Sequence, residues 1–147
     1  MPIVFTVRLK NEPGALAGLA AKLGEHGIDI RNVAAGAVGT FGCAVLSTSN
    51  DVAAREVMRK ARYSFEEGEM LSVALEDRPG GLAQLTGRLA EAGVNITGVI
   101  TLGRHQGKAE VAITVDSVDK ARQILATLAT QASAPSAARH ASPVGRR

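Results

Sequence analysis

Apolar and polar residues alternate at the start of the chain. Four apolar residues fall on one face of an extended segment: Ile3, Phe5, Val7 and Leu9. A period of two residues is typical of a strand that is buried on one side. The same alternation returns later in the chain, at Leu71, Val73 and Leu75. The sequence therefore predicts two strands of the same kind.

After each strand the spacing of apolar residues changes to three or four, which is typical of a helix with one buried face. The leucines of this face are expected in the core, and they are Leu16, Leu19 and Leu23 in one helix and Leu82, Leu85 and Leu89 in the other. Proline is tolerated in the first turn of a helix, so the Pro-Gly pairs at residues 13–14 and 79–80 mark the two starts. Gly27 and Gly93 mark the two ends.

The two strand-helix segments are copies of each other. Residues 13–30 recur at residues 79–96 with nine of eighteen positions identical, against roughly one match expected by chance. Each copy continues with a predicted hairpin, over residues 28–48 and 94–115, and then a further helix. Residues 63–67 can supply a fourth strand in the first copy, whereas the second copy has no alternating run after Leu128.

This element order predicts an α+β protein of two ferredoxin-like β-α-β-β-α-β units, each an antiparallel sheet with its helices on one face. We expect the units over residues 1–67 and 68–131, paired side by side so that their edges join in one sheet. Residues 132–147 are rich in Ala, Ser and Pro and are expected to form a flexible basic tail. Because each unit is small for an independent core, homo-oligomerisation is also expected.

The net positive charge of the chain lies in this tail. Residues 1–131 contain 14 basic and 14 acidic residues, so the formal net charge of +3 comes from Arg139, Arg146 and Arg147. A nucleic-acid-binding surface concentrates positive charge on the folded part, so nucleic acid is not expected as a partner. RNA-recognition sheets also need stacking aromatic residues, and the second copy has no Phe, Tyr or Trp.

Other classes of chemistry find little support. Cys43 is the only cysteine, and its place in an alternating segment predicts a small core residue without reactivity. The start of the chain has no apolar run long enough for a signal peptide or a membrane span, so a cytoplasmic protein without membrane contact is expected. His26, His105 and His140 join no catalytic set and no metal-ligand spacing, so no enzyme activity, metal or cofactor is expected.

Both copies resemble the ACT domain, a small-molecule regulatory module of amino-acid metabolism. The resemblance covers residues 3 to about 128 and rests on three features in the same order. These are an Asx-x-Pro-Gly loop, leucines at helical spacing, and a Gly-Ile/Val-Asx-Ile entry to the second strand. The resemblance implies that an amino acid binds at the seam between two paired domains, where the loop of one domain meets the start of strand two of its neighbour.

The chemistry of the loops agrees with this expectation. The first N–H groups of a helix lack intrahelical acceptors and can hold a carboxylate, and here they belong to Ala15 and Leu16, or to Gly81 and Leu82. The side-chain oxygen of Asn11 or Asp77 can accept a hydrogen bond from the ligand ammonium. Glycine lets a ligand approach the backbone closely, and the loops carry Gly14, Gly80 and Gly81.

Strand two supplies Asp29 and Ile30 in the first copy and Asn95 and Ile96 in the second. Pairing the loop of one copy with the strand of the other gives two unlike pockets. One pocket combines Asn11 with Asn95, and we expect it to take an ordinary amino acid. The other combines Asp77 with Asp29, whose carboxylates repel a ligand carboxylate unless one of them is neutral or otherwise paired.

Two alternatives remain open at this stage. Asn11 and Asp77 also form Asx-turns and helix caps without a ligand, and Asp29 and Asn95 can be plain exposed residues. The pairing face can also serve assembly alone, as a protein-interaction module. Polar groups left unsatisfied at a dry interface cost about 1 to 3 kcal/mol each, which favours ligand binding. We expect a free-standing regulatory protein that acts through a partner, with a metabolic enzyme or a transcription regulator as candidates.

Overall fold

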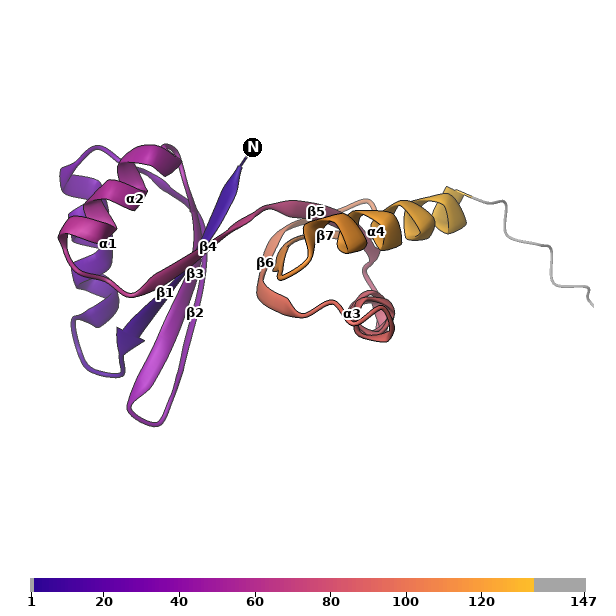
Figure 1. Ribbon diagram of the computed structural model, residues 1–147, viewed down its shortest axis with the longest axis horizontal. Helices are drawn as coiled ribbons and strands as arrows, with labels where there is room; N and C mark the ends of the chain where they lie inside the picture. Colours follow the sequence, from indigo (N-terminus) through magenta and orange to yellow (C-terminus); the bar gives the residue numbers. More distant parts are fainter. Residues whose placement is uncertain (1, 134–147) are drawn as a thin grey trace, which may run out of the picture.

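The computed structural model describes residues 2–133, which form two units in sequence (Figure 1). The first unit has the order β1 (Ile3–Lys10), α1 (Ala15–Glu25), β2 (Ile30–Val38), β3 (Phe41–Thr48), α2 (Asp51–Lys60) and β4 (Phe65–Glu69). Its four strands form an antiparallel sheet in the order β2-β3-β1-β4. Both helices cover one face, over a core that includes Phe5, Leu19, Leu46 and Met58.

The second unit repeats this plan without its last strand. It contains β5 (Leu71–Glu76), α3 (Gly81–Glu91), β6 (Ile96–His105), β7 (Lys108–Val115) and α4 (Val118–Ser133). The sheet order is β5-β7-β6, and within the described residues no fourth strand joins it. Helix α4 runs two residues beyond the expected start of the tail, and residues 134–147 lie outside the described residues. The predicted ferredoxin-like α+β class is confirmed for both units.

The two sheets pack face to face, so the prediction that both copies share one sheet within the chain is wrong. Figure 1 shows α1 and α2 on one side, the two sheets in the middle, and α3 and α4 on the other side. Strand β6 contacts β1, β2 and β3, and β7 contacts β4. The sheet faces turned away from the helices are buried by this contact, as at Val4, Ile100 and Ala112.

Small residues mark the closest approach of the sheets. A Cβ atom on Gly98 would lie 2.8 Å from Oγ1 of Thr114 and 3.2 Å from Oγ1 of Thr6. A Cβ atom on Gly68 would lie 2.9 Å from Cβ of the same Thr114. Thr114 is buried, and its hydroxyl is hydrogen-bonded to that of Thr97 at 2.9 Å. The sheets can meet here only because Gly68 and Gly98 have no side chain.

A short connection joins the two sheets. Only Met70 separates β4 from β5, so the chain leaves the edge of one sheet and directly enters the edge of the other. An ion pair between Arg122 of α4 and Glu69 of β4 spans the same junction. The end of the first unit is therefore tied to a helix of the second.

The expectation for Cys43 is wrong. Its neighbours Ala44 and Leu46 are buried under the helices, but the alternation of β3 turns Cys43 to the opposite face, together with Phe41. That end of the sheet extends beyond the second unit, and Cys43 is exposed. The predicted alternation of side chains along β3 is confirmed, but Cys43 lies on the face turned away from the helical core.

Substitution of Gly98 by Ala should destabilise the protein by about 1 to 3 kcal/mol, because the added methyl group overpacks the contact around Thr114. Gly103 lies in the same strand, and a Cβ there meets no atom within 4 Å. Gly103→Ala should therefore leave the unfolding free energy nearly unchanged. Urea denaturation of both variants tests this contact, and equal stabilities would contradict it.

Candidate functional site

The two loops that precede α1 and α3 have nearly the same geometry. Gly14 and Gly80 are the residues that precede the helices, with φ of 87° and 86°. This left-handed conformation strains any residue with a side chain, which explains the glycine after each proline. Neither helix start has a hydrogen bond from a capping side chain.

Asn11 and Asp77 bind the hairpin turn of their own unit. Nδ2 of Asn11 donates to the carbonyl oxygen of Gly39 at 2.9 Å, and Oδ1 of Asp77 accepts from Nε of Arg104 at 3.3 Å. Their backbone N–H groups donate to Thr40 and Gly107. The alternative that these side chains cap the helices is therefore wrong, because they hold each loop against the end of a hairpin.

The first helical N–H groups differ in availability. Ala15 donates to the carbonyl of Glu12 at 3.3 Å, and Gly81 donates to that of Arg78 at 3.1 Å. These two N–H groups, which are predicted to bind a ligand carboxylate, are already hydrogen-bonded within the loop. The next residues, Leu16 and Leu82, have no hydrogen-bond acceptor for their N–H groups within the described chain. They are the stronger candidates for holding an anion.

The side chains of Leu16 and Leu82 are also accessible, contrary to the expectation that all leucines of the helical stripes are buried. Their exposed fractions are 43% and 50%, while Leu19 and Leu85, one turn further on, are buried. Each loop therefore presents a free N–H group beside an exposed apolar side chain.

The entries to strand two lie at the opposite end of each unit. Asp29 and Asn95 are exposed, and their backbone N–H groups donate to Oγ of Ser49 and Oδ1 of Asp116. The following residues, Ile30 and Ile96, are half-buried. Because β1 and β2 are both antiparallel to β3, the end of β1 lies near the end of β2 and far from its start. Neither unit brings its own loop and its own strand entry together.

Strands β2 and β6 are edges of their sheets. Most of β2 is exposed, including Val33 and Val38, the latter with an exposed fraction of 91%. Asn11 is bonded to the turn that follows β2, and Asp77 is bonded to Arg104 near the end of β6. The loop residues of the predicted site are therefore coupled to the free edges of the two sheets.

Gly81 is required by the fold. A Cβ atom there would lie 2.3 Å from the carbonyl oxygen of Glu76, so α3 starts in direct contact with the end of β5. The Glu76 carboxylate is bound by the ammonium of Lys108, which lowers the pKa of Glu76 below its ordinary value. This contact explains the glycine at residue 81 by packing alone, and its role in ligand binding stays a prediction.

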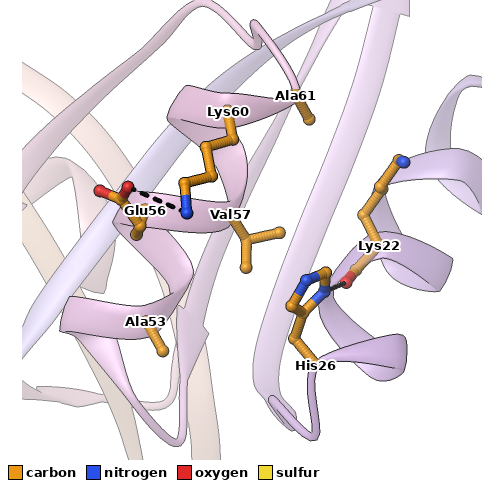
Figure 2. Close-up of a pocket in the computed structure, with 7 residues that line it drawn as sticks. All are labelled: Lys22, His26, Ala53, Glu56, Val57, Lys60 and Ala61. Carbon is orange, nitrogen blue, oxygen red and sulfur yellow. Dashed lines mark hydrogen bonds and ion pairs between the residues drawn. The ribbon is translucent and has the colours of Figure 1, made fainter.

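A separate cavity of about 380 Å³ lies between α1 and α2, at the end of α1 away from its loop (Figure 2). Three of its polar side chains have partners: His26 is hydrogen-bonded through Nδ1 to the carbonyl of Lys22 at 2.8 Å, and Lys60 pairs with Glu56 at 3.5 Å. Sequence analysis did not single out this cavity. No group of acidic, His and Cys residues in residues 2–133 has the arrangement of a metal site.

Part of the chain matches a known family model. Residues 70–129 match the model of the ACT domain. No curated protein sequence matches the chain. No helix in the described part of the chain is long and apolar enough to cross a membrane.

Solved structures share the fold over both units. Protein BT0572 from Bacteroides thetaiotaomicron has a TM-score of 0.67 at 20% identity, over 86% of this chain and 88% of that chain. The ligand-free regulatory subunit of aspartate kinase from Thermus thermophilus has a TM-score of 0.59 at 18% identity, over 88% and 91%. Aspartate kinase from Synechocystis has a TM-score of 0.62 at 20% identity, and the match covers 88% of this chain and 25% of that chain. At these identities the comparison establishes the shared fold.

Gly81→Ala should destabilise the protein by about 1 to 3 kcal/mol, because a Cβ cannot fit against the Glu76 carbonyl without moving the helix. Gly87 lies in the same helix with no atom near its Cβ position. Gly87→Ala should therefore stabilise the protein, by up to about 1 kcal/mol of helix propensity. Opposite shifts of the denaturation midpoint are expected, and a stabilising Gly81→Ala would contradict the contact.

Proposed function

We propose that this chain is a non-catalytic regulatory protein of two ACT-like units, over residues 1–67 and 68–131, that binds an amino acid at a seam between units. The observation that carries the proposal is the matching pair of loops, each with an unsatisfied N–H group beside an exposed leucine. The ACT match over the second unit, and the copied loop in the first, support one type of ligand for both.

The seam requires two chains. Within one chain the sheets pack through their faces, which leaves β2 and β6 as free edges. Antiparallel pairing of β2 from one chain with β6 of another would bring the end of each strand beside the start of the other. The turn that holds Asn11 of the first chain would then lie beside Asn95 of the second chain. The Arg104-Asp77 pair of the second chain would lie beside Asp29 of the first. These are the two residue pairs that the sequence predicts.

In this arrangement the ligand carboxylate binds the N–H of Leu16 or Leu82 at the positive end of the helix dipole. The ammonium is bound by the polar side chains, and the exposed leucine contacts the ligand side chain. The Asn11/Asn95 pocket suits an ordinary amino acid. In the other pocket Arg104 partly offsets the charge of Asp77, which weakens the expected repulsion of the ligand carboxylate.

A second candidate function is assembly without a ligand, as an interaction module or regulatory subunit. The exposed apolar residues of β2 favour it, since Val33 and Val38 would be covered by strand pairing alone. In either case the output passes through a partner, with a metabolic enzyme or a transcription regulator as the candidates. A ligand that bridges two units stabilises the orientation that it binds better, and the partner responds to that change.

A thermal-shift screen of the twenty amino acids, followed by titration calorimetry, tests the proposal. A ligand at 100 times its dissociation constant adds about 2.7 kcal/mol of stability, which is readily measured. Asn11→Ala and Asn95→Ala should each abolish the shift, whereas Lys120→Ala, at an exposed position on α4, should not.

The same experiments separate the two functions. Because the seam needs two chains, the apparent ligand affinity should fall when the protein is diluted below the dissociation constant of the assembly. No response to any amino acid would favour the assembly module. A selective response that survives Asn95→Ala would contradict the assignment to the Asn11/Asn95 pocket.

A further inference from the structure

Strand β5 is an open edge, although its counterpart in the first unit is covered. Val73 and Leu75 correspond to Val7 and Leu9 by the offset of the repeat. Strand β1 lies between β3 and β4, and Val7 and Leu9 are buried. Within residues 2–133, β5 pairs only with β7, and Val73 and Leu75 are half-buried.

The backbone of β5 offers hydrogen bonds to this open side. The N–H of Asp77 donates to the carbonyl of Gly107 on the β7 side. Since alternate residues of an antiparallel strand bond to opposite neighbours, Ser72 and Ala74 direct their N–H and C=O groups to the edge. Glu76 directs its N–H there, while its carbonyl accepts from the N–H of Arg78 at 2.9 Å. In the first unit Arg8, the counterpart of Ala74, bonds in this direction, because its N–H donates to Ser64 beside β4 at 2.9 Å.

A groove of about 620 Å³ runs along the open edge. Its apolar lining comes from Val73 and Leu75 of β5, Leu85 of α3, and Leu125 and Leu128 of α4. The groove therefore has a strand edge on one side and two helices above it. This combination suits an extended segment that adds backbone hydrogen bonds and inserts apolar side chains.

The first unit shows what fills such a space. Phe65 of β4 lies opposite Val7 and packs edge-on against Phe5, with ring centroids 5.9 Å apart. The hydroxyl of Tyr63 reaches α1 and lies 3.7 Å from the Cβ position of Gly18. Gly18 corresponds to Gln84, which lines the groove of the second unit. The groove thus occupies the place that the Tyr63-Phe65 segment fills in the first unit.

The edge strands β4 and β5 also differ in how strongly they repel a further strand. Strand β4 carries three glutamates, Glu66, Glu67 and Glu69, which disfavour a further strand on its open side. Between Leu71 and Leu75, β5 has no charge and no proline. The remaining residues of the chain, 134–147, contain no Phe, Tyr or Trp and two prolines, so their sequence does not match the segment that fills the first unit.

We propose that the groove is filled by β5 of a second copy of this chain, in an antiparallel pair with its two-fold axis at Ala74. A two-fold axis makes the strands antiparallel, as β4 is to β1. In this register Leu75 of the second copy lies opposite Val73, the place that Phe65 takes opposite Val7. Ser72 lies opposite Glu76 of the second copy, so no like charges face each other.

This contact and the proposed ligand seam use different strands. The contact uses β5, whereas the proposed seam uses β2 and β6, at the other edges of the sheets. The two contacts can therefore coexist in one assembly, such as a tetramer formed by pairs of dimers. Loss of one contact should not remove the other.

The first test replaces Ala74, which is exposed and directs its N–H to the open edge. Ala74→Pro removes that N–H without removing a bond to β7. The particle mass, measured by light scattering after gel filtration, should halve. Ala74→Ser keeps the N–H and should leave the mass unchanged. Amino-acid binding should persist in both variants. The β5 contact can therefore be disproved without disproving the proposed function, and the reverse.

The second test fixes the register and does not depend on the proline variant being folded. In a Cys43→Ser background, Ala74→Cys places two thiols opposite each other across the axis, with Cα atoms about 5.5 Å apart, and mild oxidation should give a covalent dimer. Ser72→Cys is the matched control, because its copy lies about four residues away along the strand, beyond disulfide reach. An unchanged mass for folded Ala74→Pro, or no covalent dimer from Ala74→Cys, would overturn the proposal and leave the groove to residues 134–147 or to another protein.

Discussion

The contact between the two sheets constrains the rest of the molecule. Thr114 is enclosed between Gly68 and Gly98, which come from different units, and no side chain would fit at either glycine without displacing it. Because each sheet uses its open face in this contact, that face is largely withdrawn from other partners. What remains for recognition are the strand edges and the loops at the ends of the sheets. The predicted binding residues lie in those places, which is why the chain is expected to act as an assembly of several copies.

The sequence predicted the elements and the missing strand, but it did not predict how the units pack. Period two identifies which residues of a strand face the helices, and it did so for Phe5 and Val7. It does not show whether the opposite face meets water or another sheet, since small uncharged residues such as Thr6 and Thr114 suit both. Helical spacing likewise predicts Leu16 in the core, but this residue is 43% exposed, because the spacing of leucines does not show how far the core extends along the helix.

The site was predicted by residue type rather than by contact. Asn11 and Asp77 were identified from a pattern of four residues, but their partners, Gly39 and Arg104, lie 28 and 27 residues further along the chain. No local pattern could have indicated them. The Arg104 partner changes the chemistry of the second pocket, since a carboxylate paired with a guanidinium repels an anionic ligand less than a free one does. The two proposed pockets are therefore more alike in charge than their aspartates and asparagines imply.

The divergence of the two copies gives the chain edges with different properties. In the first unit β4 covers β1, and the glutamates of β4 disfavour a further strand on its outer side. In the second unit β5 is an open edge without charge between Leu71 and Leu75. Met70 and the Arg122-Glu69 ion pair join these two edges. A rotation of one unit against the other would therefore reorient β5 and its groove together with the seam strands. If an amino acid at the seam favours one orientation, it must alter the free energy of association at β5, and association must alter ligand affinity by the same factor.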